Sequence, residues 1–82
     1  MKRSRHRIVS QILELCVSGA SKTRIVYKVN LNFRTVNPYM DMLIKNELVR
    51  VENGKNLSYK TTEKGRDLLN NFREISSQLI EI

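Results

Sequence analysis

Side chains that can bind an anion dominate the first half of this 82-residue chain. Residues 1–40 carry a net charge of +7, whereas residues 41–82 hold equal numbers of acidic and basic groups. A surface that serves only solubility mixes its signs, so an excess confined to one half indicates an electrostatic face for an anionic partner. The basic residues of the first half are Lys2, Arg3, Arg5, Arg7, Lys22, Arg24, Lys28 and Arg34.

One group of polar residues has the types needed to recognise bases. Arg34, Thr35 and Asn37 lie at the start of a predicted helix. Arginine pairs with guanine O6 and N7, and asparagine pairs with adenine N6 and N7, each through two hydrogen bonds. A simpler interpretation stays open, in which Asn37 is only a cap before Pro38 and Arg34 contacts only a phosphate.

A second group has the types needed to bind phosphate. Lys22, Thr23 and Arg24 open another predicted helix, where free backbone N–H groups and positive charge together favour an anion. Further candidates for phosphate contact are Arg3, Arg5 and Arg7 in an N-terminal arm, Lys28, and Lys55 near a predicted turn. The alternative for Lys22, Thr23 and Arg24 is an ordinary solvated helix face. The arm could instead be a tail that only aids solubility, and Lys55 could belong to an ordinary hairpin turn.

The scarcity of other reactive groups excludes several classes of protein. Cys16 is the only cysteine and His6 the only histidine, so a disulfide framework and a cysteine-based zinc site are excluded. Ser4, His6 and Glu14 lack an oxyanion site and a second base, so we expect no enzyme, no cofactor and no small-molecule ligand. Cys16 continues the apolar face of its helix and is expected to be a buried, reduced thiol.

The N-terminus has basic residues followed by apolar ones, as a signal peptide does. Gln11 and Glu14 interrupt the apolar stretch, which follows a helical period instead. It is also shorter than the roughly 20 apolar residues that span a bilayer. We therefore expect a cytoplasmic protein without a membrane segment.

The apolar periodicity predicts three helices in the first half of the chain. Two span residues 5–17 and 22–29, the first ended near Gly19 and the second capped by Ser21. The third carries Pro38, which lacks an N–H group and clashes with the carbonyl four residues before it. We expect this helix to start near Thr35, which places Pro38 in its first turn, and a kinked helix from Asn32 is the alternative.

The second half predicts a hairpin and a long helix. Residues 48–51 and 57–61 are predicted strands, joined by a tight turn at Asn53-Gly54, since both residues tolerate positive φ. Thr62 is the predicted cap of a helix that runs to the C-terminus. Its apolar residues recur at the a and d spacing of a coiled coil and form a predicted dimerisation seam of Leu68, Phe72, Ile75, Leu79 and Ile82.

This order of elements predicts a mostly α fold with a small β-hairpin, the winged helix-turn-helix. Residues 1–62 would form the DNA-binding part, including the basic arm, and residues 63–82 the dimerisation helix of one compact domain. The second helix of the turn motif would enter the major groove of DNA.

The residues also carry a family resemblance. The stretch Ser18-Gly19-Ala20-Ser21-Lys22-Thr23-Arg24-Ile25, with Asn30-Leu31, Tyr39 and Leu43 and the later Thr62-Glu63-Lys64-Gly65 before Leu68-Leu69, resembles the archaeal winged-helix DNA-binding family of the small Sulfolobus chromatin-associated type. The resemblance covers about residues 8–72. It implies a homodimer joined through an antiparallel coiled coil of the C-terminal helices.

We therefore expect a homodimer that binds double-stranded DNA as a transcriptional regulator or a chromatin-associated protein. The alternative is a winged-helix module that binds an acidic protein. RNA binding is a weaker alternative, because aromatic residues make up only 6% of the chain and tryptophan is absent.

Overall fold

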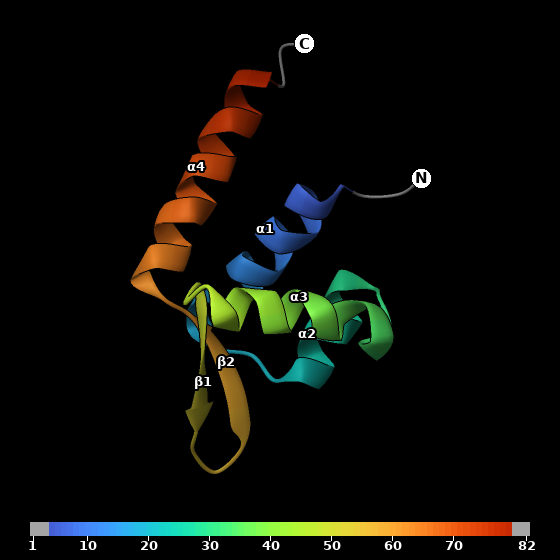
Figure 1. The fold of residues 1–82 in the computed structure, drawn as a ribbon. Helices are drawn as coiled ribbons and strands as arrows, with labels where there is room; N and C mark the ends of the chain where they lie inside the picture. Colours follow the sequence, from blue (N-terminus) through green and yellow to red (C-terminus); the bar gives the residue numbers. More distant parts are fainter. Residues whose placement is uncertain (1–3, 80–82) are drawn as a thin grey trace.

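The computed structural model describes residues 4–79 (Figure 1). The elements follow one another as α1 (Arg5–Leu15), the 3₁₀ turn η1 (Cys16–Ser18), α2 (Lys22–Val29), α3 (Phe33–Lys45), β1 (Val49–Asn53), β2 (Leu57–Thr61) and α4 (Glu63–Leu79). This is the predicted order of helices and hairpin. The hairpin and α4 leave the helical body in opposite directions (Figure 1).

Each of the four helices begins after a polar residue that caps it. The capping side chain accepts a hydrogen bond from the backbone N–H group three residues further along, which satisfies a donor that has no partner inside the helix. The donor–acceptor distances lie between 2.8 and 3.2 Å. The four caps are Ser4, Ser21, Asn32 and Thr62.

The start of α3 differs from the main expectation. The helix begins at Phe33 and carries Pro38 in its interior, so the predicted start near Thr35 was wrong and the alternative start at Asn32 was closer. The side-chain oxygen of Asn32 accepts a 2.8 Å hydrogen bond from the N–H group of Thr35, which stabilises the earlier start. Pro38 costs the helix one hydrogen bond, because it cannot donate to the carbonyl of Arg34.

Two turns also differ from their predicted form. The last residues of the first predicted helix form the 3₁₀ turn η1, which leads into Gly19 at a φ of 90°. In the hairpin, Asn53 pairs with Leu57, so β1 runs two residues beyond the predicted strand and three residues form the loop. Neither Asn53 nor Gly54 has a positive φ, so the tight turn expected from this pair was wrong.

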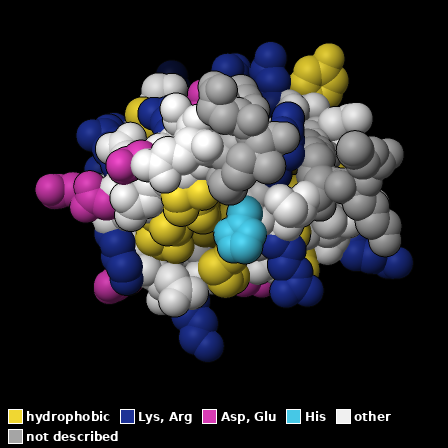
Figure 2. Space-filling view, turned by 90° about the horizontal axis from the view of Figure 1, so that it is seen from above, with side chains coloured by type: hydrophobic (Ala, Val, Ile, Leu, Met, Phe, Trp, Pro, Cys, Tyr) yellow, Lys and Arg dark blue, Asp and Glu magenta, His cyan; other side chains and the backbone are white. Residues whose placement is uncertain are grey.

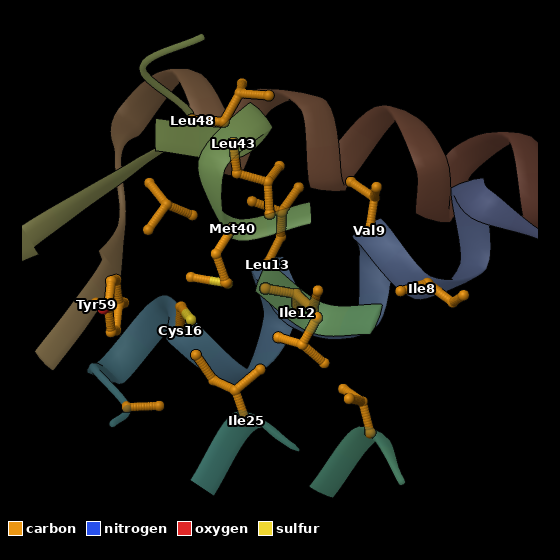
Figure 3. Close-up of a cluster of buried hydrophobic side chains, with 14 of the residues drawn as sticks. Ile8, Val9, Ile12, Leu13, Cys16, Ile25, Met40, Leu43, Leu48 and Tyr59 are labelled. Atoms are coloured by element: carbon orange, nitrogen blue, oxygen red, sulfur yellow. The ribbon is translucent and has the colours of Figure 1, made fainter. Parts of the chain in front are cut away.

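The core lies where α1 meets α2, α3 and the hairpin (Figure 3). Ile12 and Leu13 of α1 and Leu43 of α3 are fully buried, and Tyr59 of the hairpin is buried beside them. Cys16 is also fully buried, as predicted, and its burial raises the pKa of the thiol to about 12. None of the described helices is long and apolar enough to cross a membrane.

The apolar residues of α4 divide between the core and the surface. Leu69 is buried, and Leu68 and Phe72 pack against the core, whereas Ile75 is 52% exposed. The a/d spacing did not indicate Leu69. This residue lies on the face of α4 next to the predicted seam, and that neighbouring face is the one turned to the core. The side chain of Leu79 and the whole of Ile82 lie outside the described residues, so that part of the predicted seam stays a prediction.

Candidate nucleic-acid interface

The start of α3 presents two of the predicted base-contacting residues to solvent. Arg34 and Thr35 are the second and third residues of α3, and both are exposed. Val36, directly after them, is fully buried and anchors this turn to the core. The first turn of α3 is therefore held in place from one side and open to a ligand on the other.

Asn37 lies in a different environment from Arg34 and Thr35. Its Oδ1 atom is buried and has no hydrogen-bond partner within residues 4–79. It follows the buried Val36 and precedes the buried Met40 by three residues, so helical geometry places it on the flank of α3. In this conformation its acceptor atom does not face solvent as the side chains of Arg34 and Thr35 do.

Two charged residues of α3 were not among the predicted contacts. Asp41 and Lys45 are exposed and lie seven and eleven residues after Arg34, so all three project from one side of the helix. Asp41 is the acidic residue of this face, and a carboxylate there accepts a hydrogen bond from cytosine N4 but repels phosphate. This helical spacing was readable from the sequence once the helix was known to start at Phe33.

The N-terminus of α2 lies against the hairpin. The Lys22 ammonium group stands 5.7 Å from the centroid of the Tyr59 ring, in cation–π geometry. Ala20, just before α2, exchanges two backbone hydrogen bonds with Tyr59, of 3.0 and 2.8 Å. Lys22 and the exposed Thr23 are thus positioned next to the base of the hairpin.

The other basic residues of α2 face α1. Arg24 and Lys28 line a hollow of about 370 Å³ whose opposite wall is formed by the C-terminal half of α1. Glu14 of this wall pairs with Arg73 of α4 at 3.6 Å, an exposed ion pair. The structure therefore separates Arg24 and Lys28 from Lys22, although the three are close in sequence.

The N-terminal basic residues are further away still. Arg5 and Arg7 belong to the first turns of α1 and are exposed. Arg7 lines a groove of about 750 Å³ between α1 and α4. The start of α1 and the outer part of α4 lie at the end of the molecule opposite the hairpin tip (Figure 1). Arg3 lies outside the described residues.

The hairpin carries the last predicted contact at its tip. Lys55 is exposed in the three-residue loop after β1. Arg50 and Lys60 are cross-strand partners on one face, and Arg50 forms an exposed ion pair with Glu52 at 3.1 Å. The tip is thus basic, and the acidic residue near it is already paired.

The order of three helices, a hairpin and a fourth helix is that of a winged helix-turn-helix protein, and comparison with known families gives the same class. Residues 2–79 match the winged helix-turn-helix family model, and the chain belongs to this family. The predicted fold class is confirmed.

Particular relatives come from archaea. The chain is 33% identical over 75 residues to an uncharacterized protein of Methanocaldococcus jannaschii, covering 90% of this chain and 74% of the relative. A second uncharacterized protein of the same organism is 33% identical over 76 residues, covering 92% of this chain but only 35% of the relative.

A solved structure is also similar. Sso10a-2, a DNA-binding protein from Sulfolobus solfataricus, matches with a TM-score of 0.82 and 26% identity, over 92% of this chain and 80% of that one. The resemblance to an archaeal family of the Sulfolobus type is therefore confirmed.

Proposed function

We propose that this protein binds double-stranded DNA through α3, the N-terminus of α2 and the hairpin. The observation that carries the proposal is the first turn of α3, which is anchored by buried Val36 and presents Arg34 and Thr35 to solvent. Lys22 beside the hairpin and Lys55 at its tip provide positive charge for phosphate. The DNA-binding activity stated for the similar Sulfolobus protein supports this proposal.

The two kinds of contact have different roles. Lysine and arginine side chains that meet phosphates supply affinity and set the register on the duplex, whereas contacts with base edges supply specificity. Arg34 is the proposed base-reading residue, and Lys22, Thr23 and Lys55 are proposed phosphate contacts. Arg24, Lys28, Arg5 and Arg7 lie on other surfaces and are proposed as peripheral phosphate contacts. Arg3, outside the described residues, stays a proposed contact of the same kind.

We further propose that two copies associate through α4. Phe72 and Ile75 line the groove between α1 and α4, and the His6 ring meets the Phe72 ring edge-on at 5.8 Å. Figure 2 shows hydrophobic side chains gathered beside the histidine at this end of the molecule. In this arrangement residues 1–62 contact DNA and residues 63–82 join the two copies as an antiparallel coiled coil.

A salt titration tests DNA binding. With about four to six phosphates neutralised per protomer, the slope of log affinity against log salt is expected to be roughly −4 to −5 per protomer. Electrophoretic titration of a random duplex over a salt series measures this slope. Absence of binding at low salt contradicts the proposal, and retention of an acidic protein by the same surface favours the interaction-module alternative.

Selection of binding sites from random duplexes distinguishes the two biological roles. A recovered palindrome is expected of a dimeric transcriptional regulator, because half-site symmetry follows protein symmetry. Binding without enrichment is expected of a chromatin-associated protein, whose contacts are mainly to phosphate.

A further inference from the structure

The hairpin has an apolar face that continues beyond the protein core. Strand register places Val51 opposite Tyr59 and Asn53 opposite Leu57, and side chains of directly opposed residues share a face. At the base of this face Tyr59 is buried in the core. Towards the tip, Val51 is 39% and Leu57 49% exposed. The apolar stripe Tyr59–Val51–Leu57 therefore leaves the core and ends in solvent.

Within residues 4–79, no other part of the chain fully covers Val51 and Leu57, the outer part of the stripe. The hairpin points away from α1 and α4, and its tip extends past the helices (Figure 1). Moving the exposed leucine side chain from water to an apolar surface would lower the free energy, because apolar area is removed from water. The two side chains are thus available to a partner that the tip reaches.

The charge around the stripe identifies the chemistry of that partner. Lys55 lies in the loop just before Leu57, and Lys22 lies over the Tyr59 ring at the other end of the stripe. Lys60 and Arg50 occupy the opposite face, and Glu52 is paired with Arg50. The apolar stripe lies between positive charges, so a matching partner has an apolar interior bordered by anions. A stack of bases between two phosphate backbones has both features.

We infer that the wing, the name given to the β1–β2 hairpin in this fold, inserts Leu57 near its tip between two base pairs from the minor groove. Val51 lies behind Leu57, and Lys22 and Lys55 contact the flanking phosphates. This inference rests on the proposed function and deepens it. Apolar wedges of this kind partly unstack a base step and kink the duplex by about 20 to 90°. The wing therefore acts as a bending element, and pyrimidine–purine steps, which unstack most easily, are its preferred targets.

Fluorescence of a base analogue tests the insertion directly. The probe is an A·T-rich duplex of about 20 base pairs with 2-aminopurine at several adenine positions, whose emission rises when stacking is lost. Saturating wild-type protein is expected to raise the emission, and Leu57→Lys is expected to leave it at the level of free duplex. A donor–acceptor pair on the duplex ends reports the bend, which is expected to disappear in the same variant.

Three further variants separate insertion from charge and from folding. Ser58→Lys adds the same charge one residue away on the opposite face, and it is expected to keep the full rise in emission. Leu57→Met keeps an apolar side chain and is also expected to keep it. Leu57→Ser is expected to bind about three- to tenfold more weakly, corresponding to the loss of a half-buried leucine contact.

The outcomes distinguish the wedge from the proposed function. If wild-type protein binds without raising the emission, or if Leu57→Lys raises it as the wild type does, the wedge is wrong while DNA binding stands. If wild-type protein does not bind the duplex at low salt, DNA binding itself is wrong. Thermal unfolding of each variant, followed by circular dichroism, is expected to show unchanged midpoints because the tip is exposed.

Discussion

The hydroxyl group of Thr61 donates a 2.6 Å hydrogen bond to the backbone carbonyl oxygen of Leu13. This buried bond joins the end of the hairpin to the first helix, 48 residues earlier in the chain. Next to it, the Thr62 hydroxyl donates to the Glu47 carbonyl at 2.6 Å and accepts from the Gly65 N–H at 3.0 Å. Two consecutive threonines therefore fix the position of the wing and the start of α4.

Replacing Thr61 is expected to loosen this junction. Thr61→Val keeps the shape of the side chain but removes the donor, so the free energy of unfolding should fall by about 0.5 to 1.5 kcal/mol. Urea denaturation measures the change. Thr61→Ser keeps the hydroxyl group and is the matched control for the hydrogen bond. Equal stability of Thr61→Val and the wild type would show that the bond has no net effect.

Gly65 is expected to tolerate no side chain. A Cβ atom at this position would collide with the Leu48 carbonyl oxygen and come within 2.7 Å of Thr61 Cγ2. Gly65→Ala should therefore lower the free energy of unfolding by about 1 to 3 kcal/mol, although alanine is the better helix former. Gly54→Ala, where a Cβ atom meets nothing within 4 Å, is the control and should be nearly neutral. Similar denaturation midpoints for the two variants would contradict the prediction.

Cys16 is expected to make stability depend on alkaline pH. Burial raises the pKa of this thiol from 9.0 to about 12, so the folded protein holds the proton more tightly than the unfolded chain. Its contribution to stability is complete below pH 9 and is lost as the pH rises from about 9 to 12. The unfolding free energy of the wild type relative to Cys16→Ala, from urea titrations at several pH values, should fall across this window. A constant difference would contradict the burial effect.

Asp41 is expected to contribute to sequence selectivity on the side of α3 that is proposed to face DNA. Asp41→Asn removes a negative charge that repels phosphate, so binding to random duplex should strengthen and discrimination between sequences should decrease. Arg34→Ala should also relax sequence preference but weaken binding, whereas Lys22→Ala should weaken all sequences alike. Competition titrations with selected and random duplexes separate the three effects. Weaker binding by Asp41→Asn to random duplex would show that the carboxylate is not near phosphate.

Ile75 is expected to lie in the contact between two copies. Ile75→Glu places a charge in the groove between α1 and α4 and should shift the protein from dimer to monomer in sedimentation. Leu79→Glu, further along the predicted seam, should have the same effect. Asn71→Glu adds the same charge at an exposed position of α4 outside the seam and should leave the dimer intact. If the wild type sediments as a monomer, the proposed coiled coil is wrong, while the proposal of DNA binding still stands.

Local chemistry in the sequence was enough to predict the order of the elements and the bounds of two of them. The second helix was predicted with its observed bounds, and Ser21 and Thr62 cap helices as expected, because capping needs only a side-chain oxygen three residues before a free N–H group. The return strand, residues 57–61, was also predicted with its observed bounds. Periodicity likewise predicted that Cys16 is buried.

Tertiary packing decided the remaining features, because they depend on contacts between residues far apart in sequence. Leu69 is buried although the a/d spacing favoured Leu68 and Phe72, and Gly65 in the first turn of the same helix lies so close to the Leu48 carbonyl group that a Cβ atom would not fit. Pro38 is tolerated inside α3, where buried residues on both sides of it hold the helix. The basic residues of the first half that the structure describes lie on separate surfaces: the first turns of α1, the side of α2 that faces α1, and the elements proposed to bind DNA.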